Sequence, residues 1–287
     1  MRFLIIQERG RHEKNREFRE ALCMKRSLER AGHACNVWGL NYDNFSIPFE
    51  EVSRGCDVLV SLENYDTGWH PNISKFNGLK VFWSIDSHCA LAQHVEHCRN
   101  NKFDLILNAT EKYLPYFSRY VTKGVWFPNA YPADLFTSRP NVIRNVPVGF
   151  CGSSIPQRDA ILNRICQEIN IKRDVFVVGN DMIDALSSYQ IAFNFNIADD
   201  INYRTFESTA AGAMLLTNQT PNIEKLFDVN KEIVTYRSID ELLQKVRYYL
   251  HYEQEREKIA AAGQSRAVKD HSYDTRAKQF ISLLNSA

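Results

Sequence analysis

Short apolar runs alternate with amphipathic segments along almost the whole chain of 287 residues. The runs are continuously apolar, which is typical of parallel strands buried on both faces by helices. This rhythm favours parallel α/β sheets over antiparallel strands with one exposed face. The expected strands cover residues 3–6, 35–39, 57–62, 80–85, 104–109, 124–127, 146–151, 174–179, 191–197, 213–217 and 232–236.

The rhythm occurs twice, and a proline-containing segment separates the two series. Residues 127–141 hold three prolines and show no helical period, which is typical of an interdomain linker. We therefore predict two Rossmann-like domains, 1–127 and 128–270, that face each other across a cleft. Ligands of such sheets bind at the carboxyl ends of the strands, so the candidate site residues are those that follow each strand.

The sequence also predicts two helical segments. A helix is predicted from about Lys14 to Ala31, with Gly32 as its C-cap residue. The terminal segment 271–287 carries an apolar stripe that needs a surface to bury against. That stripe comprises Tyr273, Ala277, Phe280, Leu283 and Leu284.

Charge and cysteine usage exclude several classes of protein. The formal net charge is +1, with 17 basic and 15 acidic residues through Phe127 and 18 and 19 after it, so broad nucleic-acid binding has no electrostatic support. The first apolar run has only four residues and charges follow it, unlike a signal peptide or a membrane span. Seven cysteines lack CxxC spacing, which favours reduced thiols and a cytoplasmic protein.

The stretch "NYRTFESTAAGAMLLTN", residues 202–218, places a glutamate inside a segment of small residues. Residues 203–212 have the length of a short helix, and small residues let its backbone approach a strand or a ligand closely. A glutamate in mid-helix is usually solvated, and the alternative is that Glu207 binds a ligand. Asp199 and Arg204 follow the 191–197 strand, and a salt bridge from Arg204 to Asp199 or Asp200 is the simpler reading of that arginine.

The segment after the 80–85 strand contains several polar candidates. Asp86 and His88 are expected at the strand end, where they could bind an acceptor or transfer a proton, or where Asp86 or Ser87 could cap a helix. His94 and Cys98 are four residues apart and could share a metal, but no second ligand pair has a suitable spacing. We therefore expect no metal site there and a helix with its histidines directed outward.

Two other segments follow predicted strands. Residues 8–20 are dense in both charges, and Arg11, His12 and Lys14 could contact a ligand, although a solvated helix face explains most of the charges. In the segment 64–70, Trp69 could stack on a sugar, or it could pack at the edge of the domain.

The second half of the sequence resembles the GT-B glycosyltransferases. Residues 202–207 give an Asn-x-Arg-x-Phe-Glu pattern, and a small-residue helix and a Leu-Leu-Thr strand follow it. A Glu-Ile-Val-x-Tyr strand comes next, then a helix after Ser-x-Asp-Glu-Leu. A His-x-Tyr-x-x-Arg signature ends the pattern at His271, Tyr273 and Arg276. The nearest resemblance is to the group-1 branch that includes spore-maturation proteins of the CgeB type. It is strong over about 190–285, weaker over 124–160 and only architectural over 1–120.

The resemblance implies a role for each candidate in the second domain. Glu207 would accept hydrogen bonds from the ribose hydroxyls of a nucleotide sugar, since a carboxylate can bind a cis-diol with two oxygens. The helix N-terminus would face the diphosphate. Asp199 would contact the donor sugar, with Asp200 as the alternative. The implied donor-binding residues are Gly152, Ser153, Arg158, Asp199, Asn202, Tyr203, Arg204 and Glu207.

The implied activity is transfer of a sugar, with a hexose expected, from a nucleoside diphosphate sugar, with retention and without a metal. Asp86, His88, Arg158 and Arg204 would carry the catalysis, in which charge on the departing diphosphate is stabilised. The acceptor could be a glycan, a protein, a small molecule or a nucleic-acid base. A sugar-nucleotide epimerase and a non-catalytic nucleotide-sugar-binding protein stay open as alternatives. The resemblance also implies that the terminal helix crosses back to the first, acceptor-side domain.

Overall fold

The computed structural model describes residues 1–64, 67–137 and 139–285. The chain divides into two compact units, one formed by residues 1–129 with the segment from Tyr273 onward, and the other by Ala130–Ser272. Parts of two expected segments, residues 65–66 within 64–70 and Ser138 within the linker 127–141, lie outside the described residues. Each unit is an α/β sandwich built on one parallel sheet, as the apolar runs predict.

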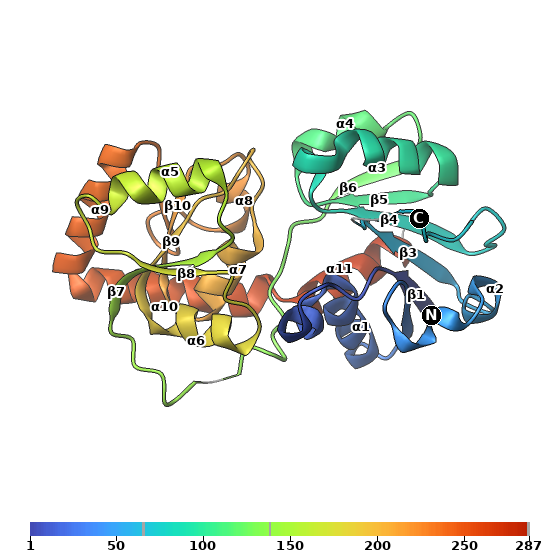
Figure 1. Cartoon of the computed structure of the whole chain (residues 1–287), viewed down its shortest axis with the longest axis horizontal. Coiled ribbons are helices and arrows are strands. Elements are labelled where there is room, and N and C mark those ends of the chain that lie inside the picture. Colours follow the sequence, from blue (N-terminus) through green and yellow to red (C-terminus); the bar gives the residue numbers. More distant parts are fainter. Residues whose placement is uncertain (65–66, 138, 286–287) are drawn as a thin grey trace. The chain divides into compact units, whose positions relative to one another are not determined.

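The first unit is a six-stranded parallel sheet in the order β2-β1-β3-β4-β5-β6. Figure 1 shows helices on both faces of this sheet, with α3 and α4 on one side and α1 and α11 on the other. The strands are β1 (Arg2–Ile6), β2 (Ala34–Trp38), β3 (Val58–Leu62), β4 (Leu79–Ser84), β5 (Leu105–Asn108) and β6 (Lys123–Trp126). The helices are α1 (Glu20–Arg30), α2 (Phe49–Val52), α3 (Ser87–Asn101), α4 (Leu114–Phe117) and α11 (Tyr273–Asn285), with 3-10 turns at Glu13–Phe18, Asp43–Ser46 and Glu111–Tyr113.

The second unit is a five-stranded parallel sheet in the order β11-β10-β9-β7-β8. Its strands are β7 (Val146–Gly152), β8 (Lys172–Val175), β9 (Tyr189–Asn194), β10 (Met214–Asn218) and β11 (Val234–Tyr236). Its helices are α5 (Pro156–Ile165), α6 (Asn180–Ser188), α7 (Tyr203–Ala210), α8 (Ile223–Leu226), α9 (Ile239–His251) and α10 (Glu253–Asp270). Apolar residues of α5 and α9 pack on one face of the sheet and form a continuous core with it.

Two predicted elements differ from the observed ones. The helix expected from Lys14 to Ala31 is divided, because Arg19 has an extended backbone with ψ of 142° and separates a 3-10 turn from α1. The strand expected at 174–179 lies at Lys172–Val175 and ends before Phe176, which has a φ of 56°. A positive φ breaks the extended conformation that a strand requires.

The terminal helix α11 belongs to the first unit, in agreement with the fold that the resemblance implies. It packs along α1, and Asp274 pairs with Arg30 at 2.6 Å. The ring of Phe280 lies 5.9 Å from that of Phe3, and Phe280 is almost completely buried. The apolar stripe of this helix is therefore part of the core of the first unit.

Candidate donor and acceptor sites

In the second unit, two arginines converge on the end of β7. Arg158, from the first turn of α5, donates from Nη1 to the Ser153 carbonyl oxygen at 2.7 Å and to Ser153 Oγ at 3.2 Å. Arg204, from α7, donates from Nε to the Cys151 carbonyl oxygen at 3.0 Å. Both side chains thus bracket Gly152 and hold the turn that follows it.

Arg158 is buried although it carries a charge. Only 7% of the residue is exposed, its guanidinium lies 5.5 Å from the centre of the Phe150 ring, and Nε has no hydrogen-bond partner among the described residues. Burial lowers the pKa of Arg158, and the nearby charge of Arg204 lowers it further. A bound anion would therefore stabilise the buried positive charge of an arginine in this position.

Glu207 is buried on α7, with 6% of the residue exposed, and forms an ion pair with Arg204. A solvated mid-helix glutamate is therefore the wrong description of this residue. The charge of Glu207 acts against the burial of Arg204, so that the pKa of Arg204 is raised overall. Nη1 of Arg204 donates a hydrogen bond to Oε2 of Glu207.

A network of buried amides shapes the loop between β9 and α7. Asn196 accepts from the Asn202 backbone N–H at 3.1 Å and donates to Thr217 at 3.1 Å. Asn202 in turn donates to Asn194 at 3.2 Å. Within this loop Asp199 has a φ of 64°, a strained conformation for a residue with a side chain. The network holds the loop in a fixed path to the N-terminus of α7.

The structure places the remaining second-unit candidates along the same loop. Asp199 is exposed at the bend, and Asp200 is buried with 5% of the residue exposed. Asn202 is the N-cap residue of α7, and Tyr203 begins the helix. The second unit therefore groups Gly152, Ser153, Arg158, Arg204 and Glu207 through contacts around β7, while Asp199 lies on the neighbouring loop.

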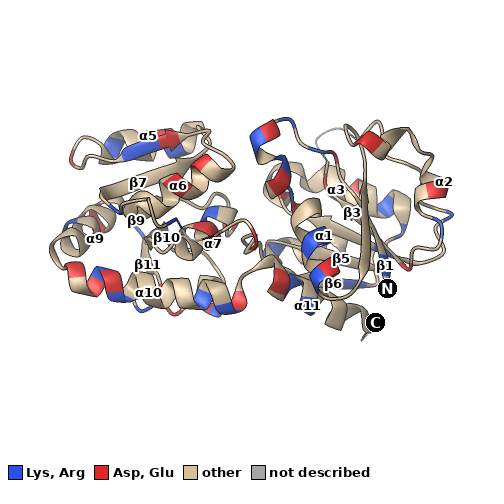
Figure 2. Ribbon diagram, turned by 90° about the horizontal axis from the view of Figure 1, so that it is seen from below, with Lys and Arg blue, Asp and Glu red and all other residues tan. Residues whose placement is uncertain are grey.

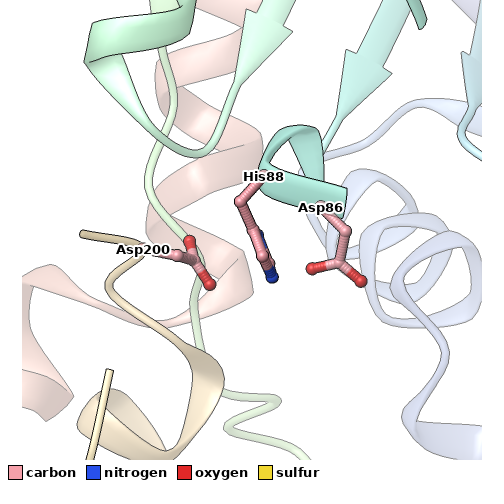
Figure 3. A group of neighbouring side chains, drawn as sticks. All are labelled: Asp86, His88 and Asp200. Carbon is pink, nitrogen blue, oxygen red and sulfur yellow. The ribbon is translucent and has the colours of Figure 1, made fainter. Parts of the chain in front are cut away.

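In the first unit, Asp86 and His88 lie where β4 leads into α3. Figure 3 shows both side chains at the start of α3; Asp200, which the figure also labels, belongs to the second unit. Asp86 is at the N-cap position, but its side chain makes no capping hydrogen bond, so helix capping does not explain it. Burial raises the pKa of the Asp86 carboxyl, and the His88 charge opposes that shift.

The histidines of α3 are not directed outward, contrary to expectation. His94 is 4% exposed, with Nδ1 2.8 Å from Ser84 Oγ and Nε2 3.5 Å from Glu63 Oε2. His97 Nε2 lies 3.1 Å from Ser61 Oγ. Burial lowers the pKa of His94 to about 4 and that of His97 to about 3. The sequence-based interpretation missed Glu63, although its position directly after the 57–62 strand was a signal.

Three further candidates have a defined environment in the first unit. Arg11 and His12 line a pocket of about 260 Å³ together with Gly10, Asn15 and Arg19. Trp69 packs against Trp38, with ring centres 6.1 Å apart, and against Phe45 at 5.7 Å. The packing role is therefore the observed one for Trp69.

Comparison with protein families gives a match over the second half of the chain. Residues 143–282 match a family described as glycosyl transferase-like. The match covers nearly all of the second unit and continues into α11. No curated protein matches the sequence.

Solved structures share the fold over the whole chain at low sequence identity. HepE from Anabaena in complex with UDP-glucose has a TM-score of 0.66 and 13% identity, with 100% of both chains covered. An alpha-glucosyltransferase (AGT) in complex with UDP has a TM-score of 0.67 and 12% identity, with 99% of this chain and 100% of the other covered. Sucrose-phosphate synthase from Thermosynechococcus elongatus has a TM-score of 0.64 and 10% identity, with 100% and 99% covered. The fold is that of the GT-B enzymes, and the family match supports glycosyltransferase activity.

Proposed function

We propose that this chain, whose residues 143–282 match a glycosyl transferase-like family, transfers a sugar from a nucleoside diphosphate sugar to an acceptor. The observation that carries the proposal is the cluster at the end of β7, where Arg158 and Arg204 flank Gly152 and Arg204 pairs with buried Glu207. Two of the similar structures hold UDP or UDP-glucose, which makes a uridine nucleotide the first donor to test.

In this proposal the residues of the second unit bind the donor. Arg158 and the turn at Gly152 and Ser153 stabilise the diphosphate, because a buried guanidinium gains a charge-assisted partner when an anion arrives. Glu207 accepts from the ribose hydroxyls, with Arg204 holding its carboxylate in place. Asp199, on the strained loop, contacts the donor sugar.

In this proposal, catalysis depends on the positioning of donor and acceptor and on the stabilisation of negative charge. Arg158 and Arg204 offset the negative charge that develops on the departing diphosphate. We propose retention at the anomeric carbon, with a leaving-group oxygen accepting the proton of the acceptor hydroxyl on the same face. Asp86 and His88 orient the acceptor or assist that proton transfer. No metal is needed in this scheme, because the arginines and the N-terminus of α7 supply the positive charge.

On the resemblance of residues 190–285, we also propose that the chain is part of the branch that includes spore-maturation proteins. We propose a hexose as the transferred sugar and leave the acceptor as a hydroxyl or amine of a glycan, a protein, a small molecule or a nucleic-acid base. Among the described residues no helix is long and apolar enough to cross a membrane.

Calorimetry with UDP and UDP-glucose, followed by NMR of the products, tests the proposal. We expect binding of both ligands and slow release of UDP from UDP-glucose, with an α-configured product from an α-configured donor. A panel of other nucleotide sugars extends the test if uridine ligands fail. The absence of binding to every member of the panel contradicts a glycosyltransferase, and a change of the sugar within the intact nucleotide sugar indicates an epimerase.

A further inference from the structure

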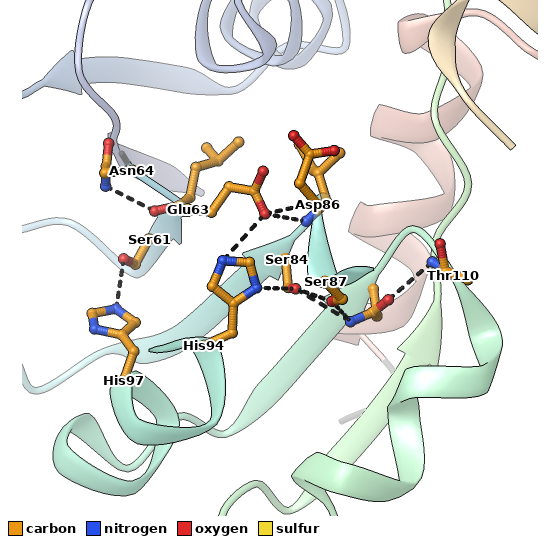
Figure 4. A network of polar contacts seen from close by, with 12 residues as sticks. Ser61, Glu63, Asn64, Ser84, Asp86, Ser87, His94, His97 and Thr110 are labelled. Carbon is orange, nitrogen blue, oxygen red and sulfur yellow. Dashed lines mark hydrogen bonds and ion pairs between the residues drawn. The ribbon is translucent and has the colours of Figure 1, made fainter. Parts of the chain in front are cut away.

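A line of buried polar side chains crosses the first unit beneath the start of α3 (Figure 4). At one end, the Thr110 backbone N–H donates to Asn108 Oδ1 at 2.9 Å. Asn108 Nδ2 donates to Ser87 Oγ at 2.8 Å, and Ser87 Oγ lies 2.6 Å from Ser84 Oγ. Asn108 and Ser84 are completely buried, and Ser87 is 1% exposed. Buried polar groups of this kind persist only when their hydrogen bonds are satisfied.

The line continues through His94 to Glu63. Ser84 Oγ lies 2.8 Å from His94 Nδ1, and His94 Nε2 lies 3.5 Å from Glu63 Oε2. The same carboxylate oxygen accepts from the backbone N–H groups of Ile85 at 2.6 Å and Asp86 at 2.8 Å. Both distances are short for backbone N–H donors. A side chain that follows β3 thus fixes the turn that follows β4.

One arrangement of protons satisfies every contact along the line. The Ser87 hydroxyl donates to Ser84, the Ser84 hydroxyl donates to His94 Nδ1, and the proton of His94 lies on Nε2, toward Glu63. This assignment requires a neutral imidazole, and burial lowers the pKa of His94 to about 4. All the donors then point toward Glu63, and each bond polarises the next.

The first turn of α3 needs this support because the helix is interrupted. Ala90 has φ of −129° and ψ of 26°, which is outside the helical range. The residues before Ala90 are therefore held less firmly by the helical ladder than those after it. Ser87 is anchored by Ser84 and Asn108, and Asp86 is anchored through its backbone by Glu63.

We propose that Glu63, held by His94, is a positioning residue that sets the turn carrying Asp86 and His88. The inference rests on the proposed function, in which Asp86 and His88 act on the acceptor. Glu63 acts only through the backbone and through its charge. Its removal changes how fast the bound donor reacts and leaves donor binding unchanged, since the donor-binding residues belong to the second unit.

The charge of Glu63 also acts on Asp86. Burial raises the pKa of Glu63, and the carboxylate of Asp86 raises it further. The other charged groups that act on this pair are His88 on α3 and Arg19 and Glu20 at the start of α1, and neutral His94 lies beside Glu63. Since the coupling between two carboxylates is mutual, loss of the Glu63 charge lowers the pKa of Asp86.

The substitution Glu63→Gln tests the inference, because an amide oxygen can still accept a hydrogen bond from the turn while the charge is lost. With UDP-glucose and water as acceptor, we expect kcat to fall at least tenfold and KM and the Kd for UDP to stay within twofold. The pKa of Asp86, measured by ¹³C NMR, should fall. The Asp86 carboxyl signal is assigned by its absence from the spectrum of Asp86→Asn. The matched control is Glu96→Gln, since Glu96 is exposed on α3 and pairs with Arg99 of the same helix at 2.9 Å; it should change none of these values.

A second variant is included in case Glu63→Gln does not fold. Glu63→Asp keeps the charge but shortens the reach to the backbone of Ile85 and Asp86, so kcat should fall with a smaller change in the pKa of Asp86. If Glu63→Gln is folded and leaves both kcat and the Asp86 titration as in the wild type, the positioning role is wrong. If the wild type hydrolyses no nucleotide sugar, the proposed function fails, and the Asp86 titration alone then decides the role of Glu63.

Discussion

Glu207 and Arg204 form a buried ion pair within the proposed donor-binding site. A carboxylate with 6% exposure would be unfavourable without a cationic partner, and Arg204 supplies one from the preceding turn of the same helix. Arg204 also donates to the Cys151 carbonyl, so the pair is attached to β7. The orientation of Glu207 is therefore set by the protein itself.

Replacing Glu207 by alanine or glutamine should weaken UDP-glucose binding at least tenfold. The reason is the loss of the proposed hydrogen bonds to the ribose hydroxyls, together with the release of Arg204 from its partner. Calorimetry measures the effect, and circular dichroism verifies the fold. Glu224→Ala, at an exposed position of the same unit, is the control. Unchanged affinity in a folded Glu207→Ala protein contradicts the ribose assignment.

At the scale of elements, α3 and the strand ends below it combine buried histidines with a carboxylate. The pKa of His70 and of His94 is lowered to about 4 by burial, and that of His97 to about 3. Between about pH 6.5 and pH 4 the unfolded chain therefore binds more protons than the folded one. The first unit should lose stability as the pH falls through this window and keep it above pH 6.5.

Denaturant unfolding at pH 7 and at pH 5 checks this expectation. All four tryptophans, Trp38, Trp69, Trp83 and Trp126, lie in the first unit, so their fluorescence reports on it alone. Each histidine should contribute up to about 1.4 kcal/mol per pH unit within the window. His97→Gln should reduce the slope, whereas replacement of exposed His251 in the second unit should leave it unchanged. A slope that is unaffected by His97→Gln argues against the buried neutral histidine.

The terminal helix α11 provides a second test at this scale. Phe280 is 1% exposed and contacts both Phe3 and Phe127. Phe280→Ala should therefore destabilise the first unit by about 3 to 5 kcal/mol, because it leaves a cavity in the core. Tryptophan fluorescence during unfolding measures the loss, and Leu283→Ala, at a half-buried position, should have a clearly smaller effect. Equal effects of the two variants mean that α11 is only loosely attached.

At the scale of the whole molecule, charge is balanced and dispersed. Basic and acidic positions are interspersed along α5 and α10 in the view of Figure 2, in keeping with a net charge of +1. A long-range field therefore contributes little to ligand capture, and in the proposed function binding depends on local groups such as Arg158.

Because these local groups are positively charged, we expect that no metal ion is required. Hydrolysis or transfer with UDP-glucose should survive treatment with EDTA, since in the proposed mechanism Arg158, Arg204 and the N-terminus of α7 stabilise the diphosphate. The assay compares the reaction rates with EDTA, with added Mg²⁺ and with added Mn²⁺. We expect these rates to differ by less than twofold. Activity that returns only after a divalent cation is added shows that the proposed mechanism is wrong.

The sequence determined the parallel sheets and the place of several candidates, since both depend on local patterns. Continuous apolar runs indicate buried parallel strands, and residues after a run lie at a carboxyl end, as Asp86 and Arg158 do. Only the tertiary structure decided the partners. Arg204 donates to the Cys151 carbonyl oxygen of β7, which is distant in sequence, and His94 turns inward because Ser84 offers it a hydrogen bond and Glu63, which follows β3, lies 3.5 Å away. The periodicity of a helix shows which residues share a face. It does not show which polar groups distant in sequence will make burial of that face favourable.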